Sequence, residues 1–98
     1  MSDNIASDLK QSRRDRHDIA AEILKTAVGG KIKTHIMYKA KLSYAQLNEY
    51  LPLLVDKGFL ETRYVGPGRK EYITTKKGTA FIENLDSIHS LWAKGNTE

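Results

Sequence analysis

The sequence has no cysteine, and only two of its 98 residues are proline. Without thiols the chain forms no disulfide and holds no thiolate metal site, which fits a reducing compartment. It also lacks the run of roughly 18 apolar residues that a membrane-spanning helix needs. The N-terminal stretch MSDNIASDLKQSRRDRHD has no apolar centre of the kind found in signal peptides. We therefore expect a cytoplasmic protein with no membrane partner.

The length of the chain suits one compact domain with a modest core. A core of this size stabilises a fold only weakly, and no disulfide reinforces it. Such chains tend to bury additional surface against a partner subunit. We therefore expect a homodimer.

The charge of the chain is basic, with a formal net charge of +4. Positive side chains concentrate in three segments, residues 10–16, 31–41 and 63–77, and the second of these contains no acidic residue. Each segment alone could be an ordinary solvated face. Three such segments together favour a polyanionic partner.

Apolar spacing predicts the first helix from Asp15 to the Gly29-Gly30 pair. Ile19, Ile23 and Ala27 recur at four-residue intervals, and glycine is the usual residue just past a helix end. Residues 1–12 carry little apolar pattern. They fit either a flexible basic and polar tail or a leading helical turn, and we favour the tail.

Two more helices are predicted before residue 60. Thr34 is suited to cap a short helix over HIMYKA. Ser43 and Gln46 form the Ser-x-x-Gln pattern of a capping box at the start of the next helix, which Gly58 ends. Pro52 lies inside this helix, so we expect one helix with a bend near Asn48.

A β-hairpin is predicted over residues 60–74, with Gly66-Pro67-Gly68 as its turn. Thr75 then caps a long final helix. Helix, short helix, capped helix and hairpin, in this order, are typical of a winged helix-turn-helix fold of the α+β class. The predicted divisions are a tail over 1–12, a winged-helix DNA-binding head over 13–74, and a dimerisation helix and tail over 75–98.

The third helix and the hairpin predict binding to double-stranded DNA. The major groove, about 12 Å wide, accepts one α-helix, and an adjacent hairpin places cations along phosphates. The candidates for base contact lie near the start of the third helix: Tyr44, Ala45, Gln46 and Asn48. The candidates for phosphate contact are basic side chains: Arg14, Lys31, Lys33, His35, Lys39, Lys41, Arg63, Arg69 and Lys70. The alternative for the helix residues is that they are solvated polar side chains.

The last helix supports dimerisation separately. The candidates for the dimer interface are spaced four, three and four residues apart, the rhythm of a coiled-coil seam: Phe81, Leu85, Ile88 and Trp92. The alternative is that this stripe packs on its own domain. Both uses are compatible, with Phe81 in the head and the last two residues in the dimer.

The residues KTHIMYKAKLSYAQLNEYLPLLVDKGFLE, with Tyr72-x-Thr74-Thr75-x-Lys77-Gly78 after them, also carry a resemblance. They resemble the archaeal winged-helix DNA-binding regulators, especially the small chromatin-type proteins that dimerise through a C-terminal antiparallel coiled coil. The resemblance covers roughly residues 15–92. It implies a homodimer with two winged heads that acts in transcription or in chromatin architecture, associated with the nucleoid. Pro52 and the short final helix depart from that pattern.

Catalysis has little support in the sequence. His17, His35 and His89 are far apart, and no acidic pattern around them has metal-ligand spacing. We expect no enzyme activity, no cofactor, no metal and no small-molecule ligand. The main alternative function is a winged-helix module for protein contact in a transcription or scaffold assembly. RNA binding is a further alternative, although the reading helix suits the wide groove of DNA better.

Overall fold

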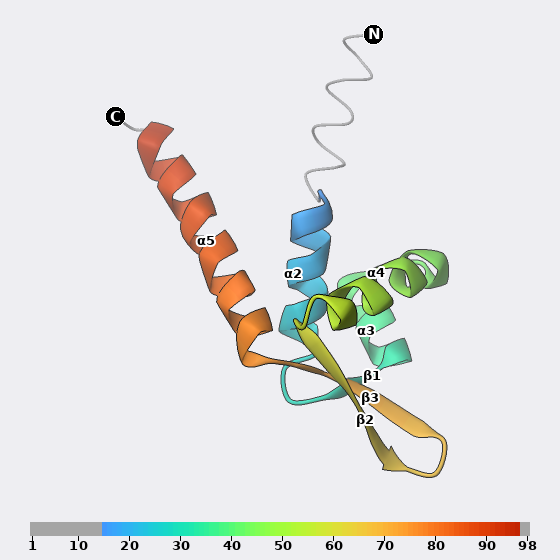
Figure 1. The fold of residues 1–98 in the computed structure, drawn as a ribbon. Coiled ribbons are helices and arrows are strands. Elements are labelled where there is room, and N and C mark those ends of the chain that lie inside the picture. Colours follow the sequence, from blue (N-terminus) through green and yellow to red (C-terminus); the bar gives the residue numbers. More distant parts are fainter. Residues whose placement is uncertain (1–14, 97–98) are drawn as a thin grey trace, which may run out of the picture.

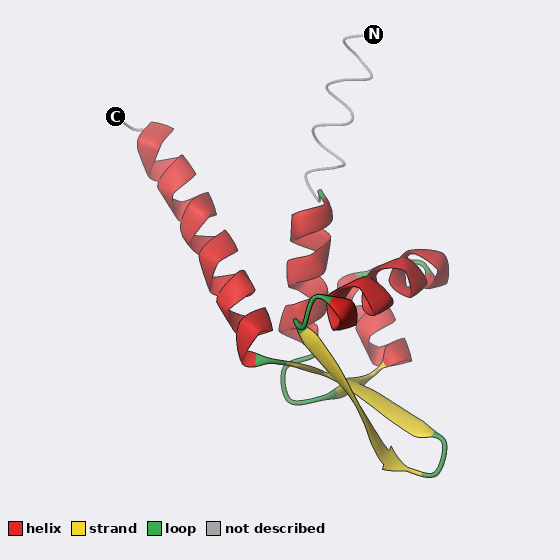
Figure 2. Cartoon of the chain, viewed as in Figure 1, coloured by secondary structure: helices red, strands yellow, loops and turns green. Residues whose placement is uncertain are grey.

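The computed structural model describes the backbone of residues 15–96 and the side chains of residues 15–93. The described chain has four helices and a three-stranded antiparallel sheet, and the hairpin projects away from the helices (Figures 1 and 2). The elements, in order, are α2 (Arg16–Thr26), β1 (Lys31–Ile32), α3 (Lys33–Ala40), α4 (Tyr44–Asp56), β2 (Leu60–Gly66), β3 (Arg69–Thr74) and α5 (Lys76–Asn96). The predicted α+β winged-helix class is confirmed. The predicted tail over 1–12 lies outside the described residues.

Helix α2 begins at the predicted position and ends at Thr26, three residues before the predicted Gly29-Gly30 pair. The Asp15 side chain accepts hydrogen bonds from the backbone N–H groups of His17 and Asp18, and the Asp18 side chain accepts one from the backbone N–H of Asp15. This reciprocal pairing satisfies backbone donors that a helix start leaves free. Gly29 and Gly30 follow the helix with φ of 85° and 97°. Residues with a Cβ rarely adopt this backbone region.

Helix α3 starts one residue before the predicted cap, and the prediction for Thr34 was wrong. Its N-cap is Ile32, which makes no side-chain capping bond. Residues Lys31 and Ile32 form a strand, β1, that the sequence analysis did not predict, and they pair with Tyr72 and Glu71 of β3. Because β1 holds the chain extended up to Ile32, the helix begins directly after it and Thr34 falls inside the first turn.

Helix α4 has the predicted capping box. The Ser43 hydroxyl accepts from the Gln46 backbone N–H at 3.1 Å, and the Gln46 side-chain oxygen accepts from the Ser43 N–H at 3.0 Å. The helix continues through Pro52 to Asp56. Its buried face meets α2 and α3 in one core, whose largest fully buried side chains are Ile23, Leu24, Ile36, Leu47, Leu54 and Leu60.

The sheet has the order β1-β3-β2, so β2 and the two-residue β1 are its edges. Strands β2 and β3, with the turn between them, form the wing (residues 60–74). The register pairs Thr62 with Tyr72 and Tyr64 with Lys70, and then shifts between Tyr64 and Gly66. This irregularity places Val65 in a bulge beside the turn.

Helix α5 is fixed to the head at its first turn. The Thr75 hydroxyl accepts from the backbone N–H of Gly78 at 3.1 Å, as the predicted cap requires, and donates to the carbonyl of Gly58 at 2.6 Å. Gly78 lies so close to the Phe59 carbonyl that a Cβ there would overlap it. Phe81 packs on Phe59 with ring centroids 5.1 Å apart.

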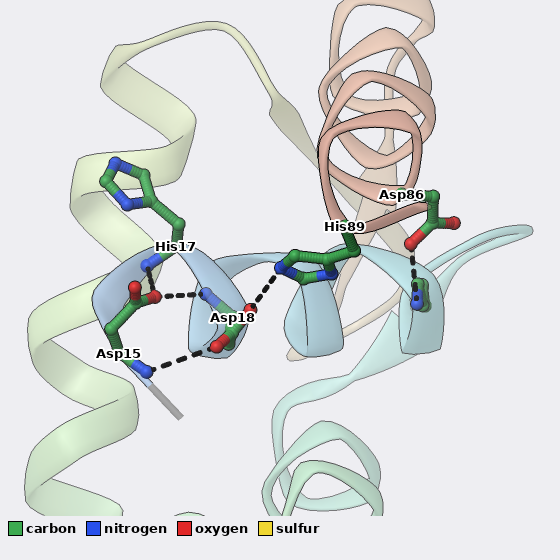
Figure 3. A network of polar contacts seen from close by, with 6 residues as sticks. Asp15, His17, Asp18, Asp86 and His89 are labelled. Atoms are coloured by element: carbon green, nitrogen blue, oxygen red, sulfur yellow. Dashed lines mark hydrogen bonds and ion pairs between the residues drawn. The ribbon is translucent and has the colours of Figure 1, made fainter. Parts of the chain in front are cut away.

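An ion pair and a histidine–aspartate contact join the middle of α5 to α2 (Figure 3). Asp86 lies 3.6 Å from the Lys25 ammonium, and His89 lies 3.5 Å from Asp18, the residue that completes the α2 capping box. Figure 1 shows that the rest of α5 extends beyond the head as a single rod. The orientation of α5 is therefore set by its first turn and by the contacts of Asp86 and His89 near its middle.

Candidate nucleic-acid interface

Three structural features lie on the side of the head that faces away from α5. They are the first turn of α3, the first turn of α4 and the end of the wing (Figure 1). We call this surface the basic side and define it by six residues: Lys33, Tyr44, Gln46, Asn48, Arg69 and Lys70. The fold thus brings together residues from three segments that are separate in the sequence.

Lys33 and Tyr44 join the two helices on the basic side. The Lys33 ammonium lies 4.6 Å from the centre of the Tyr44 ring, a cation–π contact between the first turns of α3 and α4. A hydrogen bond from Asn48 and the nearby charge of Lys33 lower the pKa of the Tyr44 phenol from its ordinary value of 10.0. Tyr44 remains largely exposed. Its exposed surface is therefore accessible to a ligand, and Lys33 and Asn48 fix its position.

Gln46 and Asn48 are exposed on the outer surface of α4, but both already have partners. The Gln46 side-chain oxygen accepts the Ser43 N–H, and the Asn48 amide hydrogen-bonds to Tyr44. Bidentate pairing with adenine needs the amide oxygen and nitrogen together. For either residue, such a base contact competes with a bond that the free protein already makes. Ala45 is exposed beside them.

A cationic groove connects α3 to the wing. It has a volume of about 570 Å³ and is lined on one side by Lys33 and Thr34 and on the other by Arg69 and Lys70. The buried Tyr72 also lines it, and the Lys70 ammonium lies 5.4 Å from the centre of that ring. Tyr72 was not predicted as a site residue. It lies two positions after Lys70 on β3, and this spacing, which puts both side chains on one face of the strand, could have identified it.

The two faces of the wing differ in charge. Lys70 shares a face with Tyr72, toward the helices, whereas Arg63 lies on the opposite face. The Arg63 guanidinium is 3.5 Å from Glu71, its direct cross-strand partner, so its charge is largely compensated. Arg63 is therefore separated from the other wing cations, although the sequence analysis grouped them.

The remaining phosphate candidates are dispersed. The Lys31 ammonium donates to the Val28 carbonyl at 3.2 Å, which holds it at the base of the sheet. Lys39 and Lys41 line a different groove, between α2, the end of α3 and α5, with Asp18 and Glu22 on its walls. His35 is exposed on α3, and Arg14 lies outside the described residues.

The candidates for the dimer interface run along one face of α5. Phe81 and Leu85 are partly buried against the head, whereas Ile88 and Trp92 are 58% and 75% exposed. Leu91, beside them, is 69% exposed. The distal half of α5 therefore presents large apolar side chains that the described part of the chain does not cover.

Within residues 15–93, His, Asp and Glu side chains form no group of three that could hold a metal ion. None of the helices over residues 15–96 is both long and apolar enough to cross a membrane.

Comparison with known proteins gives two findings. The profile of the winged helix-turn-helix family matches residues 13–93. Among solved structures, the chain is similar to Sso10a-2, a DNA-binding protein from Sulfolobus solfataricus, with a TM-score of 0.76 and 24% identity over 86% of this chain and 87% of that one. No curated protein matches the sequence.

Proposed function

Because this chain belongs to the winged helix-turn-helix family, we propose that it is a double-stranded DNA-binding protein whose contact surface is the basic side. The observation that carries the proposal is the convergence of Lys33, Arg69 and Lys70 beside the exposed start of α4. A helix end flanked by cations suits a groove bordered by two rows of phosphates. The DNA-binding activity named for the Sulfolobus neighbour, which shares this fold, is consistent with it.

We further propose that phosphate contacts contribute more to binding than base contacts. Gln46 and Asn48 are already held by intramolecular hydrogen bonds, which disfavours their turning toward a base edge, whereas the exposed Lys70 ammonium contacts only the Tyr72 ring among the described residues. Such binding tolerates many sequences and suits a chromatin-architectural, nucleoid-associated role more than that of a regulator with a strict operator. A transcriptional regulator remains the alternative within this proposal.

The protein is proposed to act as a homodimer joined through α5. The exposed Ile88 and Trp92 supply the apolar surface, and a symmetric dimer presents two basic sides to one duplex. Replacing both residues by aspartate should give a monomer in sedimentation at micromolar concentration. A double variant that stays dimeric would place the interface elsewhere.

The test of DNA binding is a salt titration with a labelled duplex. We expect the logarithm of the affinity to fall linearly with the logarithm of the salt concentration, by about 0.9 per phosphate contacted. Lys70→Ala should weaken binding to all sequences alike and reduce this slope by about 1. Lys76→Ala, which removes the same charge from exposed α5, is the matched control. A slope near zero would contradict the proposal.

The same titration with specific and scrambled duplexes separates the two roles. A good bidentate base contact contributes about 1–3 kcal/mol of discrimination. If Asn48→Ala leaves the ratio of the two affinities unchanged, the architectural role is supported; if the ratio collapses, Asn48 reads bases. The protein-contact module stays the second candidate function, because the apolar surface of α5 suits a protein. If the chain is a protein-contact module, its binding to a partner protein should be unchanged by Lys70→Ala.

A further inference from the structure

An apolar groove lies at the base of α5, on the side of the head opposite the basic side. It has a volume of about 410 Å³ and is lined by Tyr50 and Leu53 of α4, by Phe59, and by Phe81 of α5. Arg16 and Lys57 also line it. Leu53 is 39% exposed there. The groove therefore combines aromatic walls, an accessible aliphatic side chain and two cations.

The groove is continuous with the exposed stripe on α5. At about 100° per residue, Ile88 and Trp92 project within about 20° of the direction of Phe81. Asp86 and His89, which pair with α2, lie well away from that direction. The face of α5 that borders the groove at its base is thus the face that carries Ile88 and Trp92 further along.

The spacing of the stripe fits a second copy in one direction. The intervals of four, three and four residues read the same in reverse, so an antiparallel copy of α5 places residue 92 beside residue 81 and residue 88 beside residue 85. A parallel copy would bring the two heads to the same end, where each α5 is already packed on its own head. The symmetric antiparallel pairing avoids this collision.

We infer that the groove at the base of α5 is the binding site for Trp92 of the partner subunit, so that each head is completed by the other chain. This rests on the proposed homodimer and goes beyond it, because it extends the interface from the helix pair to the head. Trp92 is 75% exposed within its own chain and does not line the groove. Indole is the aromatic ring that cations bind most strongly, and Arg16 and Lys57 are placed to meet it.

The single tryptophan makes the inference directly measurable. As the concentration of the full chain rises through the dimerisation range, we expect the Trp92 emission to shift to shorter wavelength and acrylamide quenching to fall. Trp92→Ala and Leu53→Ala should each raise the dimer dissociation constant at least about tenfold, as buried anchors do. Val28→Ala, which truncates a 55% exposed side chain away from the groove, is the control and should leave it unchanged.

A variant that combines Leu53→Ala with Trp92→Ala tests whether the two side chains contact each other across the dimer. If Trp92 fills the groove, Leu53→Ala combined with Trp92→Ala weakens the dimer no more than the more severe single change. Additive effects, or a dimer whose Trp92 emission stays solvent-like, would overturn the inference while leaving an α5-mediated dimer intact. A chain that remains monomeric would remove the dimer proposal as well. Because Leu53 is partly exposed, Leu53→Ala should keep the fold, and circular dichroism checks this.

Discussion

The two sides of the head differ in chemistry although they share one core. On the basic side, Lys33, Arg69 and Lys70 converge on the exposed start of α4, and the polar side chains there are fixed by hydrogen bonds or ring contacts. On the other side, the distal half of α5 exposes Ile88 and Trp92, and an apolar groove lies at the base of the same helix. The contrast places the proposed DNA contact and the proposed contact with a second copy on separate surfaces, so substitutions should affect the two separately.

The largest expected effect comes from the core that both sides share. Leu24→Ala removes a fully buried side chain and leaves a cavity, so it should lower the free energy of unfolding by about 2–5 kcal/mol. It should also weaken DNA binding and dimerisation together. Chemical denaturation followed by circular dichroism measures the loss.

Leu91→Ala is the matched control for that change. Leu91 is 69% exposed, and surface substitutions usually change stability by less than about 0.5 kcal/mol in the monomer. Equal losses for the two leucines at low protein concentration would contradict the division between core and surface. A loss at Leu91 that grows with protein concentration would instead place it in the dimer.

Gly78→Ala should have the next largest effect and should act on the α5 side alone. The added Cβ would overlap the Phe59 carbonyl and lie 2.8 Å from the Thr74 side chain. Crowding of this kind costs about 1–3 kcal/mol, which outweighs the gain of about 1 kcal/mol in helix propensity. Thermal unfolding checks the sign, with Ser90→Ala on exposed α5 as control. If Gly78→Ala instead raises the unfolding temperature, α5 does not pack closely against Phe59 and Thr74 at Gly78.

The smallest effect concerns the basic side and pH. The pKa of Tyr44 is lowered by the Asn48 hydrogen bond and by Lys33, so its phenolate forms at lower pH than that of an ordinary tyrosine. A negative charge among these cations repels phosphate, and duplex affinity should therefore begin to fall earlier in the alkaline range. Tyr44→Phe should delay that fall, whereas Tyr38→Phe, on exposed α3, should not. Identical pH profiles for Tyr44→Phe and the wild type would remove Tyr44 from the interface.

The same lowered pKa has a defined sign for stability. A group whose pKa is lower in the folded state contributes stability at pH values above its unfolded pKa, and this contribution is lost as the pH falls through the folded pKa. For Tyr44 the contribution belongs to the alkaline range. It is therefore absent at neutral pH.

Local chemistry accounts for the parts of the fold that the sequence predicted. The Ser43-Gln46 capping box, Gly58 and the Gly66-Pro67-Gly68 turn act over a few residues, so their consequences are readable from spacing. Strand β1 was not predicted because two residues carry no periodicity. It exists only through pairing with Tyr72 and Glu71, some 40 positions later.

The site was predicted less completely because neighbours in sequence need not share a surface. Lys33 and Lys39 both belong to α3, yet six residues of helix rotate them by about 240° relative to each other. Lys33 lies on the basic side, and Lys39 lines the groove beside α2 and α5. Arg63 was grouped with the wing cations for the same reason, and only the hairpin register places Glu71 opposite it.

The order of the sheet has a consequence for self-association. Strand β2 is an edge that no other strand of residues 15–96 covers, and such an edge is the kind of template on which chains aggregate. On the face turned away from Tyr72, β2 carries the charged residues Glu61 and Arg63. The bulge at Val65 interrupts the regular pairing near the end of the strand. The opposite edge, β1, is only two residues long. Both edges therefore disfavour strand pairing between neighbouring molecules. Copies bound close together on a duplex are expected to contact each other through side chains and not to extend one sheet from head to head.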